Sequence, residues 1–145
     1  MEEEIVTTEQ PVKPTGKIFK DNILMLASML GGPLAAGYII AHNFEVFGDA
    51  ENEKRAKIFT GALVVVLLVV VYFLQGVERF QPLLIPLCYS VLANSYMKAT
   101  QRKRIDEHLK SGGETESVGT LILVIIGGLV AFTAILFAFV LVIID

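Results

Sequence analysis

The chain has 145 residues, of which 54% are hydrophobic and 19% are charged, and its formal net charge is −3. A soluble domain is usually about 45–50% apolar and about 25% charged. Here the apolar excess is gathered in long blocks without charge, which is typical of a membrane protein. The negative charge argues against a nucleic-acid partner, which normally meets a basic surface.

Residues 1–17 are predicted to form a polar tail, and residues 18–145 a single transmembrane domain. The tail is acidic, contains two prolines and shows no apolar period. A cleaved signal peptide is the alternative for the start of the chain. It needs a positively charged segment before its apolar core, and the acidic tail does not provide one.

The first expected span covers residues 23–41, about enough helix to cross a hydrocarbon core of ~30 Å. Its small residues recur at helical spacing and predict a flat face for close helix packing. The candidate packing residues of this face are Gly31, Gly32, Pro33, Ala35 and Ala36. Pro33 also predicts a kink, because it lacks an N–H group and crowds the preceding turn. A re-entrant segment is the alternative, since glycine, serine and proline dilute the hydrophobicity.

The second expected span covers residues 58–74. Asp49 is a predicted N-cap, so this helix should begin near Ala50, before the membrane. The short turn that follows, residues 75–81, predicts that the second and third helices are antiparallel neighbours.

The third expected span covers residues 80–97 and is the most polar of the four. Ser90 and Asn94 lie four residues apart and share a helix face. We interpret them as an interhelical hydrogen-bonding pair, and the alternative is that they line a polar path. Opposite charges spaced four apart continue the helix to Lys110, where Ser111-Gly112-Gly113 predicts its end.

The last expected span covers residues 118–144, with Ser117 as its N-cap. A seam of small residues runs along one face of this helix, and we expect it to pack against the small face of the first span. The seam consists of Gly127, Ala131, Ala134 and Ala138.

Together these spans predict an all-α fold, a four-helix up-down-up-down transmembrane bundle with an extended end on the third helix. Four crossings place both termini on one side and the loops 43–57 and 98–117 on the other. The loop side holds Lys54, Arg55, Lys57, Lys98, Arg102, Lys103, Arg104 and Lys110, and the opposite side holds Lys13, Lys17, Lys20 and Arg79. The positive-inside rule therefore predicts cytoplasmic loops and external termini.

Ionisable residues are missing from the interior of every expected span, which argues against an ion-coupled transporter or proton relay. No serine in the spans has a histidine or lysine at the same depth to activate it, so we expect neither an enzyme nor a cofactor. The two histidines, His42 and His108, match no metal-binding spacing, and no metal site is expected.

Several stretches of the chain resemble a group of small uncharacterised bacterial membrane proteins with four spans. The matching residues are Gly31-Gly32-Pro33-Leu34-Ala35-Ala36-Gly37-Tyr38, Asn43-Phe44, Gly48, Leu84-Ile85-Pro86, Tyr89, Gln101, Ile105, His108 and Gly112-Gly113. The resemblance implies a multi-pass protein of the bacterial inner membrane, and it implies no site residues.

The expected function is that of an integral membrane protein with a structural or accessory role, acting through helix–helix contacts. Its expected partners are the lipid bilayer and other membrane subunits or a second copy of itself. The alternative is a small oligomeric transporter or channel, with Ser90 and Asn94 facing the pore.

Overall fold

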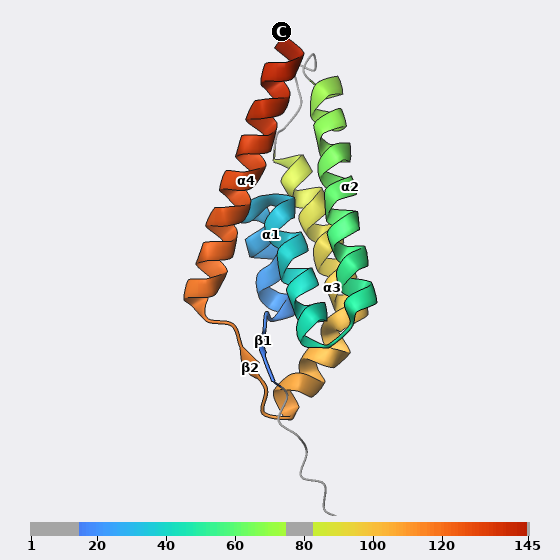
Figure 1. Cartoon of the computed structure of the whole chain (residues 1–145), viewed down its shortest axis with the longest axis vertical. Helices are drawn as coiled ribbons and strands as arrows, with labels where there is room; N and C mark the ends of the chain where they lie inside the picture. The colour runs from blue at the N-terminus through green and yellow to red at the C-terminus, as the bar shows by residue number, and fades with distance from the viewer. Residues whose placement is uncertain (1–14, 75–82, 145) are drawn as a thin grey trace, which may run out of the picture.

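The computed structural model describes residues 15–74 and 83–144 and is almost entirely helical in them. Four long helices follow one another: α1 (Leu24–Val46), α2 (Ala50–Leu74), α3 (Leu84–Lys110) and α4 (Val118–Ile144). A short strand β1 (Lys17–Ile18) and the 3-10 turn η1 (Asp21–Ile23) precede α1, and the strand β2 (Glu114–Thr115) lies between α3 and α4 (Figure 1).

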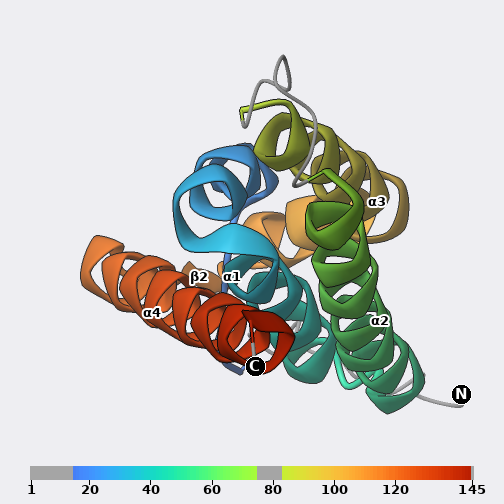
Figure 2. The same cartoon turned by 90° about the horizontal axis from the view of Figure 1, so that it is seen from above.

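Helix α1 is not one straight rod, because its backbone breaks at Gly32. The φ angle there is +76° and ψ is −174°, and the next residue is Pro33. A positive φ is available to glycine at little cost, and proline suits the first turn of a new helix, where no N–H group is needed. Residues 24–31 run away from β1, and residues 33–46 return beside them (Figures 1 and 2). The helix is therefore a hairpin of two arms.

Hydrogen bonds between the segment that precedes α1 and the last turns of α1 require this reversal. The backbone N–H of Phe19 donates to Asn43 Oδ1 over 2.8 Å, and Asn43 Nδ2 donates to the Phe19 carbonyl over 2.8 Å. In a straight helix Leu24 and Asn43 would lie about 28 Å apart, at about 1.5 Å per residue. The chain from Phe19 to Leu24 spans at most about 17 Å, so a straight α1 cannot make these contacts.

The continuous helical span expected over residues 23–41 is therefore not formed, because the chain folds back at Gly32. By length and composition, three helices are long and apolar enough to cross a membrane: Asp21–Val46, Ala50–Leu74 and Val118–Ile143. Once folded back, the arms of the first of these reach only about 12 Å and 21 Å. Neither arm matches a hydrocarbon core of ~30 Å.

The arrangement of the helices also differs from the predicted up-down-up-down bundle. Helices α2, α3 and α4 each pack against α1, and contacts among these three helices are sparse within the described residues (Figure 2). The physical reason is the small side chains of α1, which let three neighbours approach one central hairpin. The other three helices therefore form a cluster around α1.

The hairpin changes which ends of the chain lie together. We call the end of the molecule that holds β1, β2 and the last turns of α3 the base end. Strand β1 pairs with β2 there, so the start of the described chain lies beside the loops that precede α2 and α4. Helix α4 ends at the opposite end (Figure 1). The prediction that both termini share one side, away from those loops, is wrong for the N-terminal segment.

Local signals predicted the helix ends well. Asp49 Oδ1 accepts the N–H of Asn52 over 3.1 Å, and Ser117 Oγ accepts the N–H of Thr120 over 3.1 Å, so both predicted N-caps are confirmed. Helix α3 ends at Lys110, as predicted, and Gly112, two residues further on, has a φ of +79°. The predicted tail boundary at residue 17 falls inside β1, and residues 1–14, the turn 75–81 and the start of the third span lie outside the described residues.

Candidate functional site

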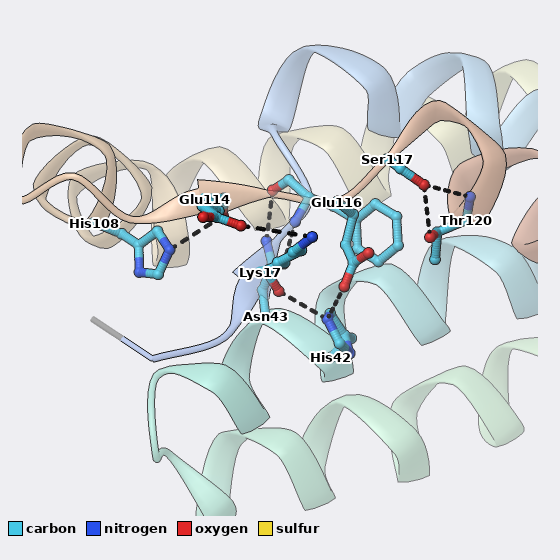
Figure 3. A network of polar contacts seen from close by, with 9 residues as sticks. Lys17, His42, Asn43, His108, Glu114, Glu116, Ser117 and Thr120 are labelled. Carbon is cyan, nitrogen blue, oxygen red and sulfur yellow. Dashed lines mark hydrogen bonds and ion pairs between the residues drawn. The ribbon is translucent and has the colours of Figure 1, made fainter. Parts of the chain in front are cut away.

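The base end is held together by a network of polar contacts that we call the basal clasp. Its residues are Lys17, Phe19, His42, Asn43, Gln101, His108, Glu114 and Glu116. Strands β1 and β2 pair in parallel, with Lys17 opposite Glu114 and Ile18 opposite Thr115. The N–H of Glu116 extends the ladder by donating to the Ile18 carbonyl over 2.8 Å. Figure 3 shows most of these side chains around the two strands.

Two buried amides form the centre of the basal clasp. Besides its two bonds to the Phe19 backbone, Asn43 Nδ2 donates to Gln101 Oε1 over 3.2 Å. Gln101 Nε2 in turn donates to the Ile40 carbonyl over 2.9 Å. Asn43 and Gln101 are fully buried, so each lost bond would leave a polar group without water as a substitute partner. The amides tie the segment before α1, the second arm of α1 and α3 to one another.

Both histidines contact the strands through Nε2. His42 Nε2 lies 3.0 Å from the Lys17 carbonyl and 3.3 Å from Glu116 Oε1, and His108 Nε2 lies 3.3 Å from the Glu114 carbonyl. Because carbonyl and carboxylate oxygens only accept, these contacts assign a proton to each Nε2. Both histidines thus act as donors to the clasp. No group of three or more metal-ligating side chains occurs among residues 15–74 and 83–144.

Helix α1 packs through contacts so close that only glycine fits them. A Cβ built on Gly31 would lie 2.9 Å from the Ile125 backbone, and one on Gly128 would lie 2.5 Å from the Gly31 carbonyl. On the other side of α1, a Cβ on Gly37 would lie 2.0 Å from Thr60 Oγ1. The five predicted packing residues of α1 are all buried: Gly31, Gly32, Pro33, Ala35 and Ala36.

The contact face of α4 is not the predicted seam. Ile125, Gly128 and Phe132 meet α1, whereas a Cβ on Gly127 would find nothing within 4 Å. The seam residues Gly127, Ala131, Ala134 and Ala138 are exposed within the chain. Successive residues of a helix point about 100° apart, so a shift from Gly127 to Gly128 turns the seam away from α1.

The expected hydrogen-bonding pair on α3 is not formed. Ser90 is fully buried, and its hydroxyl has no hydrogen-bond partner within the described residues. Asn94 is half-buried and makes no side-chain hydrogen bond to another described residue. Instead, Tyr89 Oη donates to the Ser28 carbonyl over 3.0 Å and so joins α3 to the first arm of α1. That carbonyl lies in the last turn before the helix break at Gly32, where carbonyl groups lack an N–H donor from the same helix.

One ion pair links the start of α2 to α3. Arg104 Nη1 lies 2.6 Å from Asp49 Oδ2. Hydrogen bonds from Asn52, together with that from Arg104, lower the pKa of Asp49 below its ordinary value. Asp49, the N-cap of α2, is therefore charged at neutral pH and pairs with Arg104 near the C-terminal end of α3.

Sequence reasoning missed several residues that hold this arrangement, among them Gly37, Asn43, Tyr89, Gln101 and Gly128. The signals in the sequence are two amides in apolar surroundings near helix ends, Asn43 and Gln101, and the second glycine of the pair Gly127-Gly128 on α4. No protein-family model, no curated protein and no solved structure matches the chain. The resemblance to bacterial four-span proteins stays a prediction.

Proposed function

We propose that this chain is a multi-pass protein of the bacterial inner membrane, with the base end in the cytoplasm. The support for insertion is the apolar surface of α2 and α4. None of the most apolar stretch of α4, and little of that of α2, is buried by the rest of the chain. Such extensive apolar faces are stable in lipid and costly in water.

The distribution of cations supports the orientation. The described lysines and arginines lie in or next to β1, in the first turns of α2 and in the second half of α3: Lys17, Lys20, Lys54, Arg55, Lys57, Lys98, Arg102, Lys103, Arg104 and Lys110. At the opposite end, the described parts of α2, α3 and α4 carry no charged residue. The hairpin brings Lys17 and Lys20 to the base end, so they no longer oppose the loops under the positive-inside rule.

Fusion reporters test this orientation. We expect a cytoplasm-dependent fluorescent reporter to be bright when fused before Met1 and dark when fused after Asp145, and a periplasm-dependent phosphatase to give the reverse pattern. The physical reason is that α1 turns back and leaves an odd number of crossings. A fusion pair that reports the same side for both termini would contradict the proposal and favour four crossings.

We further propose a non-enzymatic, accessory role that works through helix–helix contacts. The observation that carries it is the exposed strip of α4 formed by Gly127, Ala131, Ala134 and Ala138. Small residues on a lipid-facing helix allow the backbone of another helix to approach closely. The far half of α4, which carries Ala134 and Ala138, extends beyond the α1 hairpin (Figure 1). Gly127 and Ala131 are exposed and border an open hollow beside the second arm of α1.

The alternative, a small oligomeric transporter or channel lined by Ser90 and Asn94, is less well supported. Ser90 is fully buried inside the chain, so its hydroxyl cannot face a pore between subunits. The described apolar parts of α2 and α4 also hold no ionisable residue that would serve a coupled ion.

Co-purification of two differently tagged copies, with identification of any other membrane protein retained, tests the accessory role. We expect Ala131→Leu with Ala134→Leu to reduce the retained complex at least about tenfold, because larger side chains hold the helices apart. Val130→Leu enlarges an exposed neighbour and serves as the control. A wild-type protein that runs as a monomer without companions would refute the role.

A further inference from the structure

One exposed strip of helix α3 changes from apolar to cationic as it approaches the base end. The strip consists of Leu84, Val91, Ser95, Lys98 and Arg102, which follow one another at spacings of seven, four, three and four residues. Such spacings place side chains on one face of a helix. All five residues are exposed, whereas the buried residues of α3 lie on another face and pack against α1. The two cations therefore continue an apolar surface that the rest of the chain does not cover.

The stacked rings of Phe59 and Tyr96 show which levels of α2 and α3 lie side by side. Their centroids are 6.4 Å apart, and their planes are 14° from parallel. Lys57 comes two residues before Phe59 on α2, and Lys98 comes two residues after Tyr96 on α3. Both lysines thus lie about 3 Å nearer the base end than the rings. They are also the first charged residues at the base-side end of each apolar stretch, so in the membrane proposed above this level is the boundary of the hydrocarbon core.

This boundary places both cations of the strip in the headgroup layer. A bilayer is about 40–45 Å thick with its headgroups and about 30 Å thick without them, which leaves about 5–8 Å for each headgroup layer. Lys98 lies at the inner edge of that layer, and Arg102, four residues on, lies about 6 Å further out. Lys110 is about 18 Å beyond Lys98 and lies in water, where the last turns of α3 pass beyond the start of α2 (Figure 1).

Neither cation of the strip takes part in an ion pair of the described chain. The neighbouring Lys103 and Arg104 each pair with a carboxylate. Lys98 and Arg102 have no ion pair and no side-chain hydrogen bond within the described residues, although Asp106 lies four residues after Arg102. Like charges one helical turn apart repel each other. An anion bound between the two cations would remove this repulsion.

We propose that Lys98 and Arg102 bind the phosphate of an anionic phospholipid in the leaflet at the base end. The Arg102 guanidinium can donate two parallel hydrogen bonds to phosphate oxygens, and the Lys98 ammonium adds a second positive charge. The acyl chains of the same lipid lie along the apolar part of the strip, which a soluble phosphate cannot use. This proposal rests on the membrane insertion proposed above.

Native mass spectrometry of the full chain in mild detergent tests the lipid site. Delipidated protein is titrated with phosphatidylglycerol and with phosphatidylcholine of the same acyl chains, and with glycerophosphoglycerol, which has the headgroup but no acyl chain. We expect phosphatidylglycerol to bind at least about tenfold more tightly than phosphatidylcholine, because each cation near the headgroup adds to the preference. Raising ammonium acetate from about 0.05 M to about 0.5 M should lower this preference several-fold, since salt screens the charges. Glycerophosphoglycerol should bind at least about a hundredfold more weakly than phosphatidylglycerol.

Three glutamine variants locate the site. Lys98→Gln and Arg102→Gln are each expected to lower the preference for phosphatidylglycerol about fivefold, and the double variant should abolish it. Lys110→Gln is the matched control, because Lys110 is an exposed cation of the same helix without an ion pair in the described chain, yet lies beyond the headgroups. Its preference should equal that of the unaltered protein.

Four results would overturn the proposal: equal binding of the two phospholipids, a preference that salt does not change, an equal loss in the Lys110 variant, or glycerophosphoglycerol binding as tight as that of phosphatidylglycerol. The lipid and salt series use the unaltered protein, so they decide the matter even if a variant fails to fold. Extraction of membranes with alkaline carbonate tests insertion separately. A failed titration of a chain that stays in the membrane pellet therefore refutes the lipid site alone.

Discussion

Replacing Asn43 with leucine is expected to destabilise the protein by roughly 3–5 kcal/mol. The substitution removes the partners of the Phe19 N–H and carbonyl and one partner of the Gln101 amide, all of which are buried. Each buried polar group left unpaired costs about 1–3 kcal/mol. Unfolding by SDS in mixed micelles, followed by circular dichroism, measures the loss.

A local readout shows where the damage falls. Ile18 and Phe19 are buried in the native protein, which shields the bonds after Lys17 and Lys20 from trypsin. We expect Asn43→Leu to speed cleavage there, because the base of the α1 hairpin opens. Asn94→Leu is the matched control, since Asn94 makes no side-chain hydrogen bond to another described residue. Its effect should stay within about 0.5 kcal/mol, and equal losses in the two variants would contradict the role of the basal clasp.

The neighbouring glycines of α4 are expected to respond very differently to leucine. Gly128→Leu should cost about 3 kcal/mol or detach α4 from α1, because a Cβ there would lie 2.5 Å from the Gly31 carbonyl. Gly127→Leu should change the stability by less than about 0.5 kcal/mol, since an added Cβ meets nothing within 4 Å. The two changes alter the same helix with the same side chain, and the SDS titration compares them directly.

This pair of variants also separates folding from association. If the exposed strip of α4 binds another helix, Gly127→Leu should fold normally and still weaken the complex. Gly128→Leu should impair folding itself. Similar stabilities for the two variants would contradict the placement of Gly128, and not Gly127, on the face of α4 that packs against α1.

Features that depend on near neighbours in the chain were predictable from the residues. Asp49 and Ser117 cap the helices that follow them, because an N-cap needs only a side-chain acceptor and an N–H group three residues on. Gly112 and Gly113 end α3 for a similarly local reason, a positive φ followed by a close approach to the His108 ring. The apolar surfaces of α2 and α4 were equally clear from composition.

The reversal of α1 was not decided by its own residues. Gly32-Pro33 is compatible both with a kinked crossing and with a hairpin. The choice depends on bonds between Phe19 and Asn43, which are 24 residues apart, and on the pairing of β1 with β2 across most of the chain. Such contacts leave no periodic pattern in a sequence.

By itself, then, the sequence determined the all-helical class of the fold, the positions of the helix caps and the charged extension of α3, because each follows from composition or from residues a few positions apart. Only the tertiary structure decided the path of α1, the end of the molecule that holds Lys17, and the face of α4 that meets α1. Helix α4 is apolar on every side, so its sequence does not distinguish Gly127 from Gly128, and the choice is made by the Gly31 backbone against which the helix packs.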